Sequence, residues 1–109
     1  MLSKRFRLSR EEFKDVMKDG QMVSGKMMGI LVLRKKEEGE AKAGIIVSKK
    51  LSNKAVIRNK LKRRLRAALQ SIRPEIHSGL HLVVLPNRRA LETTAEELKN
   101  EICYLIIKN

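Results

Sequence analysis

The stretch that decides the fold is SKKLSNKAVIRNKLKRRLR, residues 48–66. It holds nine lysines and arginines and no acidic residue, yet its apolar residues recur with a helical period. At about 100° per residue, they fall within about one third of the circle. This stripe, followed to the end of the helix, consists of Ile57, Leu61, Leu65, Ala68, Leu69 and Ile72. The segment therefore predicts an amphipathic helix that packs its stripe on a sheet.

The opposite side of this helix is basic, and Ser52 or Asn53 is its expected N-cap. The basic side consists of Asn59, Lys60, Lys62, Arg63 and Arg66, with Arg58 and Arg64 on the shoulders of the apolar stripe. Like-charge pairs four residues apart, such as Lys54 and Arg58, each cost about 0.2–0.5 kcal/mol. From residue 41 to residue 74 there are eleven basic residues and no acidic one. An ordinary solvated face mixes both signs, so this helix is typical of a surface that binds a polyanion.

The composition indicates a single domain, residues 1–109, with a mainly aliphatic core. The chain is 42% hydrophobic, has no Trp, two Phe and one Tyr, and carries a net charge of +13. This charge indicates nucleic acid or an anionic membrane as the partner. The membrane is disfavoured because the stripe lacks Trp and Phe and is needed for the core. The lone Cys103 cannot form an internal disulfide, and no apolar run follows the basic N-terminus, so we expect a cytoplasmic protein without a secretory signal.

Two further helices are predicted by capping boxes. Ser9 and Glu12 begin a short helix that Gly20 ends. Thr94 and Glu97 begin the last helix. The apolar stripe of the last helix consists of Leu98, Ile102, Leu105 and Ile106. Both helices are therefore expected to be amphipathic elements that cover a sheet.

Three apolar runs predict strands, at residues 25–36, 43–50 and 79–87. Their short length and β-branched content favour strand over helix. The first two predict an antiparallel hairpin that turns around Gly39, and a further short strand fits residues 21–26. The order of elements predicts an α+β sandwich in which helices pack on a mixed sheet.

The segment VSKKLSNKAVIRNKLKRRLR, residues 47–66, resembles the signature of the bacterial ribonuclease P protein subunit. In that family a strand ending in a V-S-K-K-like run precedes a helix with R-N-R, an aliphatic residue, K-R and a later R. Here those helix positions hold Arg58, Asn59, Lys60, Leu61, Lys62, Arg63 and Arg66. RFRLSREEFKDVMKDG, residues 5–20, resembles the family's first helix, and LHLVVLPNRRA, residues 80–90, resembles its late strand. The resemblance covers nearly the whole chain.

This resemblance implies an α-β-β-β-α-β-α fold, related to a ribosomal-protein-like sandwich, with a left-handed crossover between parallel strands. It implies a protein that binds a large catalytic RNA and helps it remove the 5′ leader of precursor tRNA. The RNA would hold the Mg ions and carry out the hydrolysis, so the protein alone is not expected to cut. The implied partners are ribonuclease P RNA and precursor tRNA, with no membrane and no further protein required.

The resemblance also implies roles for individual residues. The RNA-binding set consists of Lys49, Lys50, Lys54, Arg58, Asn59, Lys60, Lys62, Arg63 and Arg66. Phe13 and Met17 would line the leader cleft, with ordinary core packing as the alternative role for both. Further strand candidates are Met28, Ile30, Val32 and Ile46. Two departures from the family pattern are Lys60, which lacks the planar fork of arginine, and an extra residue, Lys54, near the helix start.

No nuclease centre is expected in the protein itself. His77 and His81 lack a neighbouring cysteine or carboxylate set with metal-ligand spacing, and Cys103 is expected to be a buried or half-buried thiol. Two alternatives to a ribozyme cofactor stay open. One is a structural RNA-binding protein of the ribosome. The other is a DNA-binding protein, although the chain lacks the compact second helix of a helix-turn-helix.

Overall fold

The computed structural model describes residues 6–35 and 39–107 of the chain. The start of the first family-like segment, two acidic residues of the expected turn and the last two residues lie outside the described residues. The helices and strands are α1 (Arg10–Asp19), β1 (Gln21–Ser24), β2 (Met28–Arg34), β3 (Lys42–Ile45), α2 (Ala55–Ile72), β4 (Leu80–Pro86) and α3 (Ala95–Ile107). Two 3-10 helices, η2 (Arg73–Glu75) and η3 (Arg88–Glu92), flank β4. The order α-β-β-β-α-β-α is the expected one.

The four strands form a mixed sheet in the order β1-β2-β4-β3. β2 is antiparallel to both β1 and β4, whereas β3 is parallel to β4. The expected hairpin between the second and third strands is therefore wrong, because β4 inserts between them. Val83 of β4 lies opposite Leu31 on one side and Gly44 on the other. The only hairpin-type pairing of consecutive strands in the described ranges joins β1 to β2, and it uses the short strand expected at residues 21–26.

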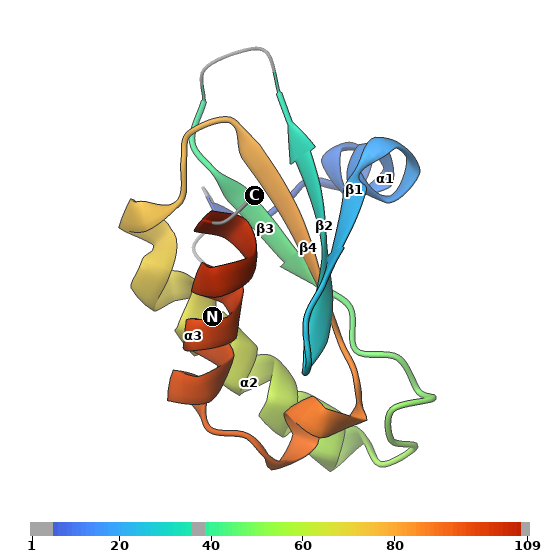
Figure 1. Ribbon diagram of the computed structural model, residues 1–109. Helices are drawn as coiled ribbons and strands as arrows, with labels where there is room; N and C mark the ends of the chain where they lie inside the picture. Colours follow the sequence, from blue (N-terminus) through green and yellow to red (C-terminus); the bar gives the residue numbers. More distant parts are fainter. Residues whose placement is uncertain (1–5, 36–38, 108–109) are drawn as a thin grey trace.

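Helices cover both faces of the sheet, which separates two apolar clusters (Figure 1). α2 and α3 pack on one face, and α1 packs on the other. The large cluster joins Ile30 and Leu82 of the sheet to Leu61 and Leu65 of α2. α2 thereby connects two parallel neighbouring strands across one face. The left-handed sense of this crossover rests on the family resemblance.

The predicted N-caps are confirmed in α1 and α3 but not in α2. In α1 the Glu12 backbone donates to the Ser9 hydroxyl at 3.2 Å, and the Glu12 carboxylate accepts from the Ser9 backbone at 2.8 Å. Thr94 forms the matching box with Glu97 in α3. In α2 the N-cap is Lys54, without a side-chain cap, so the expected Ser52 or Asn53 cap is wrong.

Candidate nucleic-acid interface

α2 divides sharply into a buried apolar stripe and an exposed basic side. The buried residues are Leu61, Leu65, Ala68, Leu69 and Ile72, while Ile57 at the start of the stripe is half-buried. On the other side Asn59, Lys60 and Arg63 are exposed, and Lys62 and Arg66 are half-buried. The first turn contains no acidic residue that would complement the helix dipole. The helix is thus held by its stripe, and its basic side faces the solvent.

The two shoulder arginines already have partners within the protein. The Arg58 guanidinium donates to the Ser52 carbonyl at 2.8 Å, which fixes the segment before α2. The Arg64 guanidinium donates to the carbonyls of Leu91, at 3.0 Å, and Thr93. Because guanidinium carries five donors, Arg58 retains donors for a second partner. Arg64 instead ties α2 to the segment around η3.

Two serine turns shape the segment between β3 and α2. The Ser48 hydroxyl accepts from the Lys50 backbone at 2.9 Å, and the Ser52 hydroxyl accepts from the Lys54 backbone at 3.2 Å. Such turns satisfy backbone donors locally and so need no regular secondary structure. Lys49, Lys50 and Lys54 are all exposed as a result. We call these three lysines together with Arg58, Asn59, Lys60, Lys62, Arg63 and Arg66 the α2 surface.

A hollow of about 240 Å³ joins α1, β3 and α2. Phe13 of α1, Gly44 and Ile45 of β3, and Lys62 and Arg66 of α2 line it, with Arg7, Leu8 and Ala43 completing its wall. The Phe13 ring is half-buried over the sheet, so it packs on the smaller apolar cluster and lines the hollow at the same time. The structure therefore places the first-helix aromatic beside two cations of the α2 surface.

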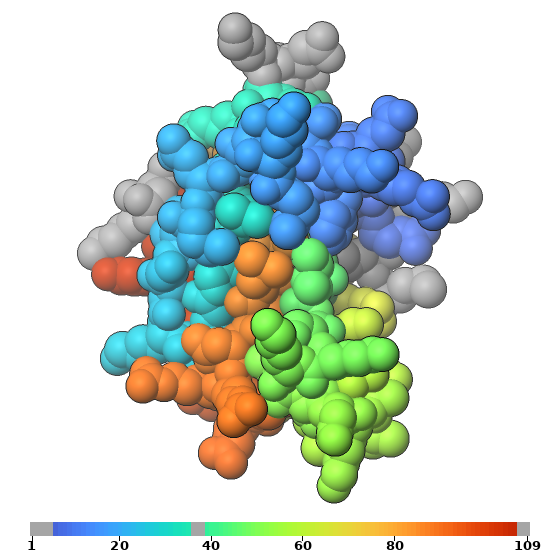
Figure 2. Space-filling view, turned by 90° about the vertical axis from the view of Figure 1, so that its right-hand side faces the viewer, coloured from blue at the N-terminus to red at the C-terminus, as the bar shows by residue number. Residues whose placement is uncertain are grey.

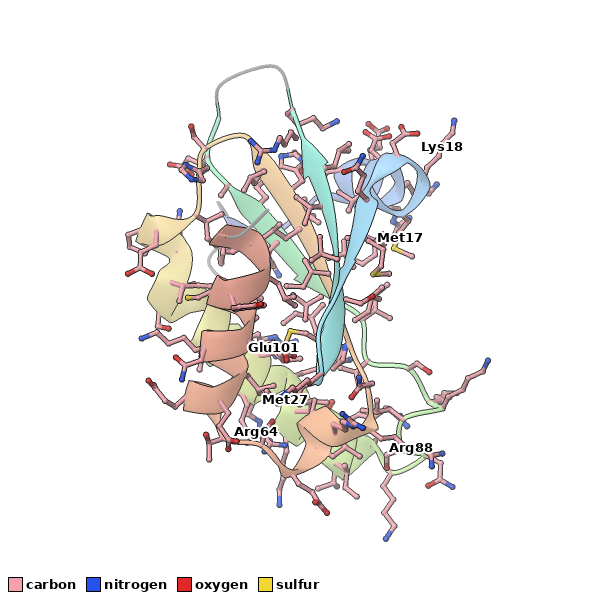
Figure 3. The ribbon with its side chains drawn as sticks, viewed as in Figure 1. Met17, Lys18, Met27, Arg64, Arg88 and Glu101 are labelled. Atoms are coloured by element: carbon pink, nitrogen blue, oxygen red, sulfur yellow. The ribbon has the colours of Figure 1, made fainter. Side chains whose placement is uncertain are left out.

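Met17 is 46% exposed and does not line this hollow. It extends from α1 on the side of the sheet opposite α2 and α3 (Figure 3). On the same side, Met22 of β1 lies over Gly29, and a Cβ on that glycine would be 2.8 Å from the Met22 sulfur. Met22 is 51% exposed, and Leu85 is half-buried. Met17 therefore belongs to an open apolar sheet face, not to the core.

The four strand candidates for the cleft divide between the two faces. Met28 and Ile30 belong to the large cluster under α2 and α3, and the partly buried Val32 packs against it. Ile46 belongs to the cluster on the α1 face. Sequence reasoning missed Met22, Gly29 and Leu85 on this face. Alternation along a strand shows which of its residues share a face. Only the register between neighbouring strands shows that these three residues lie together on the α1 face.

A charged cluster joins α1 to the sheet beside this face. The Lys42 ammonium lies 2.9 Å from the Glu12 carboxylate, and His81 Nε2 lies 3.9 Å from the same carboxylate. Burial alone would raise the pKa of Glu12, but hydrogen bonds from Ser9 and Lys42 outweigh it and lower the pKa to about 2. Burial lowers the pKa of His81. The cluster therefore combines an ion pair with a buried histidine whose pKa is lowered.

The α2 surface does not suit a divalent cation. Mg²⁺ requires oxygen ligands, chiefly carboxylates and phosphates, whereas this surface presents ammonium, guanidinium and one amide. Within residues 6–35 and 39–107, no group of three or more His, Cys, Asp or Glu residues could hold a metal ion. Cys103 is a half-buried thiol, as expected, and burial raises its pKa. In the same ranges no helix is long and apolar enough to cross a membrane.

Comparisons with known proteins agree with this geometry. The family model described as Ribonuclease P matches residues 2–108. A ribonuclease P protein component of Bacillus cereus strain AH187 is 31% identical over 105 residues, which cover 95% of this chain and 90% of that protein. One of Bacillus anthracis strain CDC 684 is also 31% identical, and the match covers 95% of this chain and 87% of that protein.

Solved structures show the same fold. A Staphylococcus aureus RNase P protein mutant with defective mRNA degradation activity superposes with a TM-score of 0.82 at 26% identity, covering 96% of this chain and 88% of its own. The Thermotoga maritima RNase P protein in complex with 1-(4-fluorophenyl)-2-thiourea superposes with a TM-score of 0.80 at 25% identity. That match covers 94% of this chain and 99% of the other.

Proposed function

The chain belongs to the ribonuclease P protein family, and from this premise we propose how its surfaces serve tRNA processing. It is a protein component of ribonuclease P. The α2 surface binds the phosphate backbone of the catalytic RNA subunit. The α1 face of the sheet receives the 5′ leader of precursor tRNA. The RNA holds the Mg ions and hydrolyses the phosphodiester, and the protein alone does not cut.

The single observation that supports this role of α2 is that one side of the helix is apolar and buried while the other is basic and exposed. Its stripe is fully buried at Leu61, Leu65 and Leu69, so the helix has no freedom to turn its basic side inward. The exposed side carries cations without one acidic neighbour from residue 41 to residue 74. The cost of crowding like charges is relieved when phosphates replace water and counterions around them. Arg63 and Arg66 add guanidinium groups that match phosphate geometry.

The leader proposal rests on the apolar face beside α1. Phe13 lines a hollow together with Lys62 and Arg66, an arrangement that suits a base against the ring and a phosphate against the cations. Met17 and Met22 are exposed thioethers farther along the face. Apolar side chains contact bases without reading a specific hydrogen-bond pattern. We therefore propose that the leader is gripped with little sequence preference.

The assignment of the Mg sites to the RNA and not to the protein follows from the groups that each of them presents. A cationic surface attracts RNA but repels Mg²⁺, so the metal sites belong on the RNA, whose phosphate oxygens are suitable ligands. By placing cations against the RNA, the protein reduces the Mg²⁺ concentration that folding and substrate binding require. We propose that the protein works as one domain, residues 1–109, in the cytoplasm, and that no second protein is required.

Reconstitution tests the role of α2. The protein is added to a bacterial ribonuclease P RNA and a precursor tRNA at low Mg²⁺, and removal of the leader is measured. The intact chain should raise cleavage strongly, and the protein without RNA should cut nothing. Lys60→Ala combined with Arg63→Ala should remove most of the increase, because both side chains are exposed and make no hydrogen bond or ion pair within the described residues.

A charge-matched control separates this role from a general effect of net charge. Lys14→Ala with Lys18→Ala removes two exposed cations from α1 and should leave binding of the catalytic RNA nearly unchanged. Equal losses in both double variants would contradict a specific α2 surface. Loss of the folded circular dichroism spectrum in the α2 variant is not expected, since neither side chain contributes to the core.

The ribosomal alternative predicts a different partner. A structural ribosomal protein would co-purify with ribosomal subunits and would leave ribonuclease P RNA behind. The match of the ribonuclease P family model to residues 2–108 does not favour it.

A further inference from the structure

The hollow between α1 and α2 has two walls that are held in different ways. Lys62 and Arg66 form one wall, and α2 is fixed there by its buried stripe on the face of the sheet opposite α1. The other wall comes from two segments, β3 and the start of α1 with the residues before it. Its members are Arg7, Leu8, Phe13, Ala43, Gly44 and Ile45. The shape of the hollow therefore depends on how the start of α1 is attached to β3.

β3 holds the start of α1 at two neighbouring positions. The Lys42 ammonium lies 2.9 Å from one carboxylate oxygen of Glu12 and 3.2 Å from the other. Two residues along β3, Gly44 lies against the Phe13 ring, since a Cβ there would be 2.6 Å from Cε2 of the ring. In the space-filling view, the blue atoms of α1 and the segment before it lie directly above the green atoms around the end of β3 (Figure 2). The ion pair and the ring contact are thus parts of one junction.

Apolar contacts hold α1 less firmly than they hold α2. Val16 is the buried residue of α1, whereas α2 contributes five buried residues to the larger cluster. The Leu8 backbone, just before α1, donates to the Ala43 carbonyl over 3.3 Å, which is long for a backbone hydrogen bond. A helix attached mainly through one fully buried side chain can turn about that point. The polar contact at Glu12 therefore has a large influence on where Phe13 lies.

Among the described residues, two lysine–carboxylate pairs link α1 to the sheet. We call Glu12 and Lys42 the α1–β3 pair, and Asp15 and Lys35 the α1–β2 pair. In the α1–β2 pair the ammonium lies 3.4 Å from a single carboxylate oxygen, and the side chains are 52% and 37% exposed. In the α1–β3 pair the side chains are 24% and 31% exposed, so solvent screens this pair less. The α1–β3 pair is the stronger attachment.

The two pairs also differ in their relation to the hollow. Glu12 and Lys42 directly precede Phe13 and Ala43, and both of these following residues line the hollow. No described neighbour of the α1–β2 pair lines it. Breaking the α1–β3 pair should therefore change the hollow, whereas breaking the α1–β2 pair should not.

We propose that Glu12 and Lys42 are positioning residues for the 5′ leader of precursor tRNA. Their ion pair sets the rotation of α1 on β3 and so sets the distance from the Phe13 ring to Lys62 and Arg66. A leader nucleotide then finds its base contact and its phosphate contacts already in place. This inference rests on the proposed function, because it takes the hollow as a place where the leader binds.

A direct contact between the Lys42 ammonium and a leader phosphate is the alternative, and Glu12→Gln separates the two. Removing a carboxylate beside a bound polyanion strengthens binding when charge is the only effect. Loss of the positioning pair weakens binding instead. Glutamine can still accept from the Ser9 backbone in the capping box, so the start of α1 is preserved.

The test measures the leader's contribution to substrate binding. Holoenzyme is assembled from each full-length variant at concentrations that saturate a bacterial ribonuclease P RNA. The affinity for precursor tRNA is divided by the affinity for the same tRNA without a leader, and we call this ratio the leader gain. The variants are Glu12→Gln, Lys42→Met and Lys42→Arg. Lys35→Met is the matched control, because it removes one cation and breaks the α1–β2 pair. Circular dichroism at the assay temperature verifies that each variant is folded.

Glu12→Gln and Lys42→Met should each lower the leader gain by about threefold or more, because the Phe13 ring no longer keeps its place opposite the α2 cations. Lys42→Arg should restore most of it, since a guanidinium also pairs with a carboxylate. Lys35→Met should stay within about twofold of the intact chain, as expected for an exposed pair. Affinity for tRNA without a leader should not change in any of the four. Equal losses in Lys42→Met and Lys35→Met would overturn the inference.

A double-mutant cycle tests whether the two residues act through one contact. Glu12→Gln combined with Lys42→Met should lose no more leader gain than either single variant, because both changes break the same pair. Losses that multiply would show two independent contacts and would also overturn the inference.

The intact chain separates this inference from the proposed function. If the intact chain showed no leader gain, leader binding itself would be contradicted, and the positioning role would fail with it. If the intact chain showed a clear leader gain that Glu12→Gln kept or increased, the positioning role alone would be overturned.

Discussion

The Lys42 ammonium of β3 lies 2.9 Å from the Glu12 carboxylate of α1, and this pair fastens the first helix to the sheet. The same carboxylate completes the capping box with Ser9. One side chain therefore caps the start of α1 and also binds the helix to β3. The pKa of Glu12 is lowered from 4.5 to about 2, because the hydrogen bonds from Ser9 and Lys42 outweigh the effect of burial. The attachment of α1 to the sheet therefore depends on an ionised Glu12.

Replacing Glu12 by Gln should destabilise the protein at neutral pH and change its response to acid. A lowered pKa stabilises the fold above the unfolded value of 4.5, and that contribution is lost as the pH falls toward 2. We expect a loss of about 1–2 kcal/mol at pH 7, less than the full shift implies, because the pair is partly solvated. Urea unfolding at pH 7 and pH 3 measures it. A variant that stays equally destabilised at pH 3 would contradict the ion-pair account.

Replacing His81 by Leu should flatten the stability profile between pH 7 and pH 5. His81 is buried, and its Nδ1 has no hydrogen-bond partner within the described residues. Burial lowers its pKa, so the fold is stabilised above the ordinary value of 6.5 and loses that contribution as the pH falls below it. Glu12 and Asp15 oppose this effect, and Lys35 and Lys42 reinforce it. Thermal midpoints at half-unit pH steps, compared with those of His77→Leu, provide the measurement. If stability depended more steeply on pH in the His81 variant than in the original chain, the proposed effect of the buried imidazole would be wrong.

How far the sequence predicts this molecule depends on whether an interaction is local. The capping boxes at Ser9 and Thr94 were predictable, because each involves residues three apart. The two sides of α2 were predictable from the helical period alone. The pairing of β3 with β4 was not, since nothing in two apolar runs indicates that β4, more than thirty residues later, separates β2 from β3. The α2 N-cap failed because the serine turns at Ser48 and Ser52 satisfy the local donors instead.

The candidate site shows the same limit. The α2 surface follows from one continuous segment and was predictable as a set. The contact between the β1–β2 turn and η3 was not, because Lys26 and Arg89 are brought together through the hydrogen bonds of Asn87. Likewise the face on which Met28 and Ile30 lie was not predictable, because the sheet order and register place both under α2. A functional surface built across strands requires the sheet order before it can be seen.

Neighbouring arginines of α2 should have opposite roles. Arg64→Ala should lower the free energy of unfolding by about 1–3 kcal/mol, because it leaves the carbonyls of Leu91 and Thr93 without their guanidinium donor. Arg63→Ala should leave stability within about 0.5 kcal/mol of the original, since Arg63 is exposed. Binding of the catalytic RNA at a temperature where both variants are folded should show the reverse order. If both variants lost the same stability and the same RNA affinity, the assignment of Arg64 to stability and of Arg63 to RNA binding would be wrong.

Met17 should tune leader affinity without affecting the fold. It is 46% exposed on the open sheet face, so Met17→Phe adds a ring that can stack on a base. Base stacking on an aromatic side chain contributes about 1–3 kcal/mol where it is fully made, so we expect holoenzyme affinity for leader-bearing precursor tRNA to rise several-fold. Affinity for mature tRNA should not change. Lys18→Phe places the same ring on the adjacent exposed position and is the matched control. An equal gain from Lys18→Phe, or none from Met17→Phe, would argue against a leader contact at Met17.

Gly44→Ala should test whether the Phe13 ring is held by the sheet. A Cβ on Gly44 would lie 2.6 Å from Cε2 and 3.0 Å from Cδ2 of Phe13, so the ring must move. Phe13 also packs with Val16, Leu31 and Val83, which leaves it little room, and overpacking of this kind costs about 1–3 kcal/mol. Chemical unfolding should show that loss in Gly44→Ala. Combining it with Phe13→Leu should cost less than the sum of the two single changes, because the smaller side chain accepts the methyl group. Additive losses would mean that the Phe13 ring and a methyl group on residue 44 do not share the contact.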